Sequence, residues 1–251
     1  MKPKKTQSRK KTESSVPNSR RIINNDTPFA VKEAYVKLRT NLMFCMTADK
    51  ERPCKSFVIT SSKPSEGKST TATNLAVSYA MLGKKVILID ADMRKPTQRK
   101  LWKIESTTGL CDFLAKIKSL ELSKVKDLPL WIVCTGTIPP NPSELLSSDR
   151  MKRFIDKCAK IYDYVIIDTP PINTVADAQI VSTYVDGVVL VSKSGDTTTD
   201  ELNAAIDAVH RAGGNLCGVV LNNMNMKTMK RYGDKYGYSY SYADKSREAR
   251  A

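Results

Sequence analysis

The sequence is poor in the residues from which many catalytic and metal sites are built. It contains one histidine, His210, so neither a catalytic dyad nor a metal cluster based on imidazole is available. The six cysteines, at positions 45, 54, 111, 134, 158 and 217, form no CxxC pair, which argues against a zinc site and against a disulfide framework. Acid and base chemistry must therefore depend on carboxylates.

Long apolar segments are also missing. No stretch approaches the roughly 18 apolar residues of a membrane span, and no apolar h-region follows the basic N-terminus. We therefore expect a cytoplasmic protein. The glycine-rich loop and the HRD and DFG motifs of the eukaryotic protein-kinase fold are absent as well, which excludes that architecture.

Positive charge is in excess, and much of it lies at the N-terminus. The net charge is +15, and residues 1–21 hold eight Lys or Arg against the single acid Glu13. Because this segment has almost no large apolar side chains, it is predicted to be a disordered basic arm. Such an arm is either a solubilising segment or an element that lies on anionic lipid, where each cation contributes about 1 kcal/mol. We expect no nucleic acid partner.

Short β-branched runs alternate with helical spacing through the middle of the chain. This alternation predicts an α/β domain over residues 22–228, with a mostly parallel sheet and helices on both faces. Because the runs are almost wholly apolar, both faces of each strand should be buried. The predicted strands are 56–60, 85–90, 130–134, 164–168, 187–192 and 217–221, and the predicted helices between them are 68–82, 148–161 and 199–212.

A further helix is predicted ahead of the first strand, over residues 31–44. Ala34, Leu38 and Leu42 recur at helical spacing, and charged residues occupy its other faces. This pattern is typical of an amphipathic helix that lies outside the sheet.

The first predicted strand leads into the segment SSKPSEGKST and then into a helix, which is the context of a phosphate-binding P-loop from Ser62 to Ser69. In such a loop the backbone N–H groups and the helix N-terminus cradle phosphate oxygens, Lys68 adds a positive charge, and the Ser69 hydroxyl binds Mg²⁺. The expected nucleotide-binding residues are Ser65, Glu66, Gly67, Lys68, Ser69 and Thr70. The alternative is a strand that ends in an ordinary polar turn.

Carboxylates follow two other apolar runs. Asp90 and Asp92 end one predicted strand, and Asp168 ends another. The carboxyl ends of parallel strands border the ligand crevice, so these acids are candidates to bind Mg²⁺ (Asp90 and Asp168, with Ser69) or to accept a proton from an acceptor hydroxyl. Whether Asp90 or Asp92 is the base stays open, and so does the alternative that all three are solvated acids at strand ends.

The assembled motifs resemble the cytoplasmic, ATP-binding component of the bacterial tyrosine kinase (BY-kinase) family, which regulates capsule and exopolysaccharide synthesis. The resemblance covers about residues 29–242 and implies a P-loop fold of the deviant Walker, partition-type ATPase class. The motifs that carry it are EAYVKLRTNLMF at 33–44, SSKPSEGKSTTATNLA at 61–76, LIDADMRKP at 88–96, TGTIPPNPSELLSS at 135–148 and IIDTPP at 166–171.

The resemblance implies an enzyme that uses ATP and Mg²⁺ to phosphorylate tyrosine, with Lys68, Asp90, Asp92 and Asp168 as its catalytic residues. Phosphorylation is expected between subunits, on a flexible tyrosine-rich tail over residues 229–251. The acceptors would be Tyr232, Tyr236, Tyr238, Tyr240 and Tyr242.

The family also implies partners. A separate transmembrane activator would dock on the chain through its cytoplasmic tail and recruit it to the inner face of the cell membrane. A homo-oligomeric ring would form through an N-terminal helix, with Glu33 and Arg39 at two positions of a Glu, Arg, Arg motif whose middle position here is Val36. Tyrosine phosphatases and sugar-metabolism proteins would be further substrates.

Two other functions are compatible with the same loop. One is a partition or septum-positioning ATPase, in which Lys63 would reach the nucleotide of a partner subunit, although Lys63 also reads as an ordinary surface lysine. The other is a scaffold that binds nucleotide without transferring phosphate. The tyrosine-rich tail favours the kinase over both.

Overall fold

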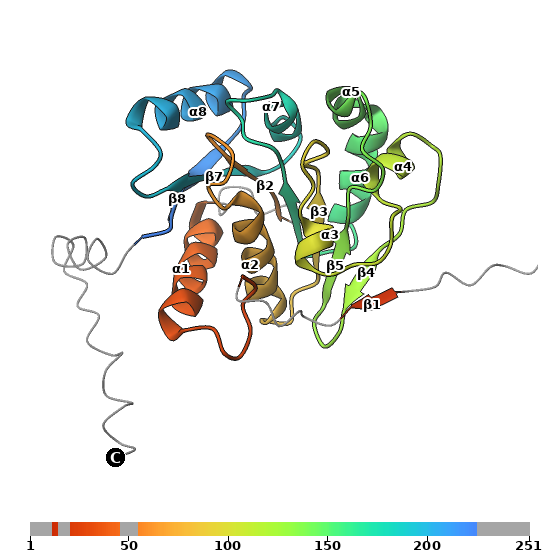
Figure 1. The fold of residues 1–251 in the computed structure, drawn as a ribbon, viewed down its shortest axis with the longest axis horizontal. Helices are drawn as coiled ribbons and strands as arrows, with labels where there is room; N and C mark the ends of the chain where they lie inside the picture. The colour runs from red at the N-terminus through yellow and green to blue at the C-terminus, as the bar shows by residue number, and fades with distance from the viewer. Residues whose placement is uncertain (1–11, 15–20, 46–54, 225–251) are drawn as a thin grey trace, which may run out of the picture.

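The structure is a computed structural model that describes residues 12–14, 21–45 and 55–224. Eight strands form one sheet (Figure 1). They are β1 (Thr12–Ser14), β2 (Lys55–Ser61), β3 (Val86–Asp90), β4 (Ser123–Val125), β5 (Leu130–Val133), β6 (Tyr164–Asp168), β7 (Gly187–Lys193) and β8 (Leu216–Asn222). The helices are α1 (Phe29–Cys45), α2 (Lys68–Ala80), α3 (Gln98–Leu101), α4 (Leu110–Leu114), α5 (Pro142–Ser147), α6 (Asp149–Ala159), α7 (Asp177–Ser182) and α8 (Thr199–Arg211).

The strand order is β1-β4-β5-β3-β6-β2-β7-β8. All neighbouring pairs are parallel except β4 and β5, so the prediction of a mostly parallel sheet is confirmed. The chain passes from β2 through α2 to β3, and β6 later enters between them. The carboxyl ends of β3, β6 and β2 therefore lie side by side, which is where ligands bind in sheets of this kind.

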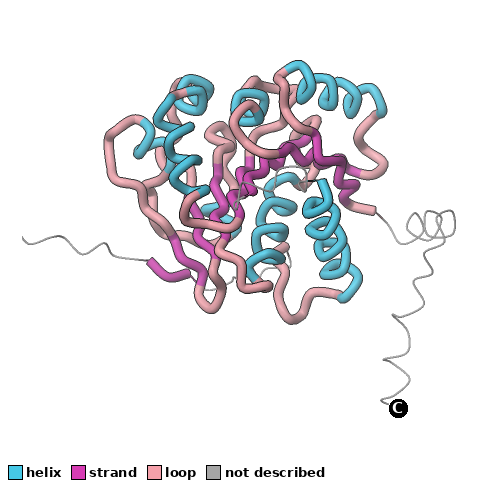
Figure 2. The backbone as a smooth tube through the Cα atoms, turned by 180° about the vertical axis from the view of Figure 1, so that it is seen from behind, coloured by secondary structure: helices cyan, strands magenta, loops and turns pink. Residues whose placement is uncertain are grey.

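Helices cover both faces of the sheet, and a separate apolar cluster fills each side. One cluster joins the sheet to α1, α2 and α3, and the other joins it to α4 through α8 (Figures 1 and 2). The central strands contribute to both clusters because successive side chains point to opposite faces. Val58 packs in one cluster, for example, and its neighbours Phe57 and Ile59 pack in the other.

The six predicted strands and the four predicted helices are all present, with ends that differ from the predicted ones by at most two residues. Local chemistry explains two of the ends. Ser148 begins α6 as an N-cap that accepts a hydrogen bond from the Met151 backbone nitrogen, and Gly213 ends α8 with a φ of 73°. The structure adds the short elements β1, β4, α3, α4, α5 and α7, which are too brief to produce a periodic signal.

Two predictions about burial are wrong. Strand β8 is not buried on both faces, since Val219 and Leu221 are 43% and 42% exposed. Among the described strands it pairs only with β7, at the edge of the sheet. On α1, Ala34 is exposed, and Tyr35 takes its place beside Leu38 and Leu42 in the contact with the apolar cluster.

The ends of the chain are only partly described. Within the predicted arm, Thr12–Ser14 form β1 beside β4. The rest of residues 1–20 and the whole of 225–251, including the predicted tyrosine-rich tail, lie outside the described residues. None of the helices in the described ranges combines the length and apolar character needed to cross a bilayer.

Candidate active site

The predicted P-loop lies between the end of β2 and the start of α2. Gly67, directly before the helix, has a φ of 97°, and Ser65 has a φ of 67°. A Cβ atom on Gly67 would lie 2.1 Å from Nδ2 of Asn222. That amide donates to the Glu66 carbonyl oxygen at 2.8 Å, so the loop is fastened to the end of β8. Glycine is therefore favoured at position 67 by its positive φ, and any larger residue would also displace the Asn222 amide.

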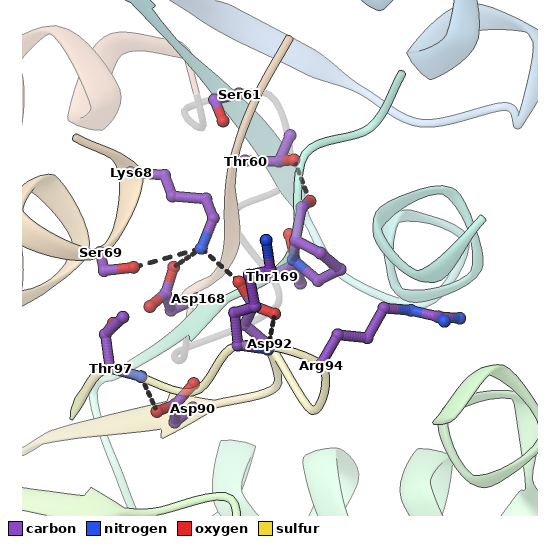
Figure 3. Close-up of polar contacts among 12 residues, drawn as sticks. Thr60, Ser61, Lys68, Ser69, Asp90, Asp92, Arg94, Thr97, Asp168 and Thr169 are labelled. Atoms are coloured by element: carbon purple, nitrogen blue, oxygen red, sulfur yellow. Dashed lines mark hydrogen bonds and ion pairs between the residues drawn. The ribbon is translucent and has the colours of Figure 1, made fainter. Parts of the chain in front are cut away.

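The predicted catalytic side chains meet at the ends of the three adjacent strands (Figure 3). The Lys68 ammonium donates to Oδ2 of Asp92 at 2.6 Å and to Oδ1 of Asp168 at 3.5 Å. It also lies 3.2 Å from the Ser69 hydroxyl. Asp90 and Asp168 occupy paired positions of β3 and β6, which places all three acids at one site. The structure thus brings Lys68 and the three acids together at one site.

Burial and charge act in opposite directions on Lys68. Removal from water disfavours its ammonium form, but the carboxylates of Asp168 and Asp92 outweigh this effect and raise the pKa of Lys68. Burial also raises the pKa of Asp168, which Lys68 and the hydrogen bond from Ser69 partly offset. In the absence of nucleotide, Lys68 therefore stays cationic and compensates the acids around it.

Asp90 lies beneath this cluster and is completely buried. Its Oδ2 atom accepts hydrogen bonds from the backbone nitrogens of Thr97 and Gln98, at 3.1 and 2.9 Å. Its Oδ1 atom is buried and has no hydrogen-bond partner within the part of the chain that the structure describes. Burial and the neighbouring Asp168 carboxylate hold the pKa of Asp90 well above its usual range. A buried oxygen of this kind is suited to a cation, a water or a proton that arrives with the substrate.

The acids and the Ser69 hydroxyl suit a magnesium ion that takes some of its ligands from the protein and the others from a nucleotide. No group of three His, Cys, Asp or Glu side chains is gathered as a cation cage among residues 12–14, 21–45 and 55–224. Magnesium does not need such a cage, since it commonly takes one or two protein oxygens and completes its shell with phosphates and water. The unpartnered Oδ1 atom of Asp90 adds a hard oxygen to this donor set.

Glu66, one of the predicted nucleotide-binding residues, braces the loop with its side chain. The side chain is fully buried, which leaves the backbone N–H as the group that can bind phosphate. Its Oε2 atom accepts from the Ser62 hydroxyl and the Lys63 backbone nitrogen, at 2.8 and 2.9 Å. Its Oε1 atom accepts from the Thr197 hydroxyl and, at 3.4 Å, from the Lys193 backbone nitrogen. The carboxylate thus ties the P-loop to the segment between β7 and α8.

Replacing Glu66 by Gln should weaken nucleotide binding about tenfold and lower the melting temperature. The Gln amide presents two N–H groups where the carboxylate accepts, so a backbone donor is left buried without a partner, at a cost of about 1–3 kcal/mol. Calorimetric ADP titration and thermal unfolding would measure both effects. Glu144→Gln is the matched control, because Glu144 is exposed. Unchanged ADP affinity in Glu66→Gln would contradict the bracing role.

Lys63 is held within its own chain. Its ammonium group donates to Oε2 of Glu201 at 3.0 Å and to the Asp196 carbonyl oxygen at 2.8 Å. Glu201 also forms the capping box at the start of α8. In this arrangement Lys63 is a partly buried lysine that is paired with an acid of its own chain.

Arg94 and Gln98 are functional candidates that the sequence did not single out. Arg94 pairs with the buried Asp177 carboxylate at 2.9 Å, which anchors the segment after Asp92 to α7. Gln98 lies fully buried among Asp168, Ser69 and Thr73. A motif beginning at Asp90 could have drawn attention to Arg94, but Gln98 gives no signal because an uncharged polar residue in a short helix is common on protein surfaces.

The other predicted residues lie outside this cluster. Arg39 donates to the Ser78 carbonyl oxygen at 2.7 Å and to the Ser78 hydroxyl at 3.1 Å, so it fastens α1 to α2. Glu33 and Val36 are half-buried on the same helix. The five predicted acceptor tyrosines lie outside the described residues.

Comparison with known proteins finds a P-loop NTPase family and a tyrosine kinase. Residues 54–248 match the family model described as ParA, NUBPL iron-transfer P-loop NTPase. The chain is 44% identical over 215 residues to Tyrosine-protein kinase YwqD of Bacillus subtilis (strain 168), covering 85% of this chain and 89% of that protein.

Two solved structures are similar to the whole described fold. The crystal structure of the chimerical protein CapA2B2 has a TM-score of 0.76 and 37% identity, and the match covers 84% of this chain and 93% of that one. The kinase domain of Escherichia coli tyrosine kinase ETK has a TM-score of 0.73 and 32% identity, and the match covers 80% of each chain.

Proposed function

We propose a function from the family to which the chain belongs: it is a member of the bacterial tyrosine-protein kinase family, built on a ParA-type P-loop NTPase domain. The protein is an ATP-dependent tyrosine kinase that phosphorylates itself and regulates capsular or exopolysaccharide synthesis. The observation that carries this function is the convergence of Lys68 with Asp92 and Asp168 at the P-loop.

The reaction divides into steps that named residues perform. Backbone N–H groups from Ser65 to Thr70 bind the phosphates of ATP, and Lys68 turns from its carboxylates to the terminal phosphates, where it neutralises developing charge. The bond from the γ-phosphorus to the bridging oxygen breaks as a tyrosine oxygen bonds to phosphorus, and ADP leaves. The tyrosine proton passes to the carboxylate pair of Asp90 and Asp92.

Magnesium would be held by Ser69 and Asp168, with the Oδ1 atom of Asp90 beside them. When bound, it supplies positive charge to the β- and γ-phosphate oxygens. The protein's own contribution at this point is orientation, because the Asp168 carboxylate is completely buried and hydrogen-bonded.

The acceptors are Tyr232, Tyr236, Tyr238, Tyr240 and Tyr242, and they are phosphorylated between subunits of a homo-oligomer. Each phosphate adds about two negative charges, which would drive the tail away from a site that already holds three carboxylates. Phosphorylation therefore releases the tail and drives a cycle of assembly and dissociation. A transmembrane activator, through its cytoplasmic tail, brings the chain to the membrane, where the basic arm meets anionic lipid.

The positioning ATPase is the weaker alternative. Two relatives, with 44% and 32% identity, are named as tyrosine kinases, and Lys63 is paired with Glu201 of its own chain. A scaffold without transfer is also disfavoured, since the lysine and all three acids of the reaction are present and in contact or adjacent.

Replacing the five tail tyrosines by Phe should abolish autophosphorylation and leave nucleotide affinity within about twofold of the wild type. The reason is that the substitutions remove acceptor hydroxyls and leave the P-loop unchanged. Tandem mass spectrometry after incubation with magnesium and ATP, with and without an activator tail, would map the phosphates, and ADP titration would check binding. Undiminished phosphate incorporation in the variant that lacks the five tail tyrosines would refute the acceptor assignment. ATP consumption without any phosphotyrosine in the wild type, even with activator, would favour the positioning ATPase.

A further inference from the structure

Gln98 is the first residue of α3 and is completely buried beneath the candidate active site. Its Nε2 atom donates to Oδ2 of Asp168 at 2.9 Å and to the backbone carbonyl oxygen of Ser69 at 3.1 Å. Its Oε1 atom accepts from the Thr73 hydroxyl at 2.7 Å. One amide therefore joins the end of β6 to the first turn of α2, the two elements that supply the proposed magnesium ligands.

The hydrogen-bond donors and acceptors around the Gln98 side chain favour an amide at this position. Both N–H groups of the side chain face acceptors, and its oxygen faces a donor, so each end of the amide has only one suitable orientation. A carboxylate of the same shape would face the Asp168 carboxylate and the Ser69 carbonyl oxygen. An apolar side chain would leave those acceptors and the Thr73 hydroxyl buried without this partner, which is costly.

The side chain and the backbone of Gln98 donate hydrogen bonds to different acids, Asp168 and Asp90. The backbone nitrogen donates to Oδ2 of Asp90 at 2.9 Å, as does that of Thr97 at 3.1 Å. Replacing the Gln98 side chain leaves these two donors in place. A substitution therefore tests the contact with Asp168 separately from the contact with Asp90.

We propose that Gln98 is a positioning residue that fixes the Asp168 carboxylate relative to Ser69 and thereby sets the magnesium-dependent part of nucleotide affinity. The Gln98 amide donates to the Oδ2 atom of Asp168, so the Oδ1 atom is the one that faces the Lys68 ammonium, 3.5 Å away. Without the amide, the carboxylate is free to rotate and loses the orientation in which it and the Ser69 hydroxyl act on the same ion. This inference rests on the proposed function of the same site.

The test compares ADP binding in two conditions, using the whole chain with Gln98→Leu and Gln98→Asn. Calorimetric titration with ADP and magnesium should show about tenfold weaker affinity for Gln98→Leu. The same titration with EDTA should agree with the wild type within about twofold. Gln98→Asn retains an amide on a shorter side chain, so its magnesium-dependent affinity should fall between those of the wild type and the Leu variant.

Ser182→Ala is the matched control, because it also removes a hydrogen bond of a buried side chain but lies on α7, away from the nucleotide. It should leave both titrations unchanged. The positioning role is overturned if Gln98→Leu weakens ADP binding equally with and without magnesium. It is also overturned if the ADP affinity of this variant equals that of the wild type in both conditions. If that variant does not fold, the Asn variant decides by the same comparison. ADP binding does not require a tyrosine acceptor, so failure of this inference is distinguishable from failure of the kinase function.

Discussion

Lys68→Met is expected to reduce phosphoryl transfer by about 10³-fold, because it removes the positive charge that would act on the terminal phosphates in a buried site. Phosphotyrosine formation from magnesium and ATP, followed by mass spectrometry at several times, would measure the loss. Lys152→Met is a control that changes an exposed lysine of α6 in the same way and should retain full activity. Retention of wild-type transfer in Lys68→Met would contradict the assignment of this loop.

The same substitution should also lower the stability of the nucleotide-free protein. The side chains of Lys68 and Asp92 are only 10% and 4% exposed, and that of Asp168 is fully buried. Removing one partner of a buried ion pair costs about 3–5 kcal/mol, since it leaves charge without compensation. The melting temperature should fall by about 10 °C, given ~2–4 °C per kcal/mol for a domain of this size.

A double variant separates stability from catalysis. Lys68→Met combined with Asp92→Asn removes the carboxylate that lies 2.6 Å from the ammonium, so much of the lost stability should return. Activity should not return, because no cation is restored to the phosphates. If the double variant is no more stable than Lys68→Met, the contact between Lys68 and Asp92 does not stabilise the folded chain.

Asp90→Asn is expected to lower phosphoryl transfer by about 100-fold or more and, at neutral pH, to raise the melting temperature. The first effect follows from loss of a carboxylate proposed to accept a proton or face the metal. The second follows from burial and the Asp168 carboxylate, which raise the pKa of Asp90 in the folded protein. Asparagine keeps an oxygen for the backbone donors of Thr97 and Gln98 without placing a charge in the interior.

The stabilisation expected from Asp90→Asn should depend on pH. A carboxyl group whose pKa is raised by folding contributes stability below its unfolded pKa of about 4, and this contribution is lost as the pH rises through the folded value. The advantage of Asp90→Asn should therefore be larger at pH 8 than at pH 5. Thermal unfolding at both pH values would measure it, with Asp207→Asn on the exposed side of α8 as control. An advantage that is equal at the two pH values, or larger at pH 5, would show that ionised Asp90 does not destabilise the fold.

Sequence alone determined the features that depend on local pattern. The apolar runs that end at Asp90 and Asp168 predict buried parallel strands, and the segment from Ser62 to Ser69 predicts a phosphate loop, because each pattern lies within a few consecutive residues. The rule that carboxyl ends of parallel strands share one edge then brings Lys68 and the acids together. The family motifs lie in these same segments, so the family was also predictable.

Only the tertiary structure decided which side chains hold these segments in place. The sequence predicts Glu66 only as part of the phosphate loop, whereas its carboxylate accepts hydrogen bonds from groups more than 120 positions away, at Lys193 and Thr197. Gln98 gives no signal in the sequence, since its partner Asp168 is 70 positions away. Hydrogen bonds at such separations leave no periodic signal, because they depend on which strands become neighbours. The insertion of β6 between β2 and β3 makes these strands neighbours and so determines the arrangement of the site.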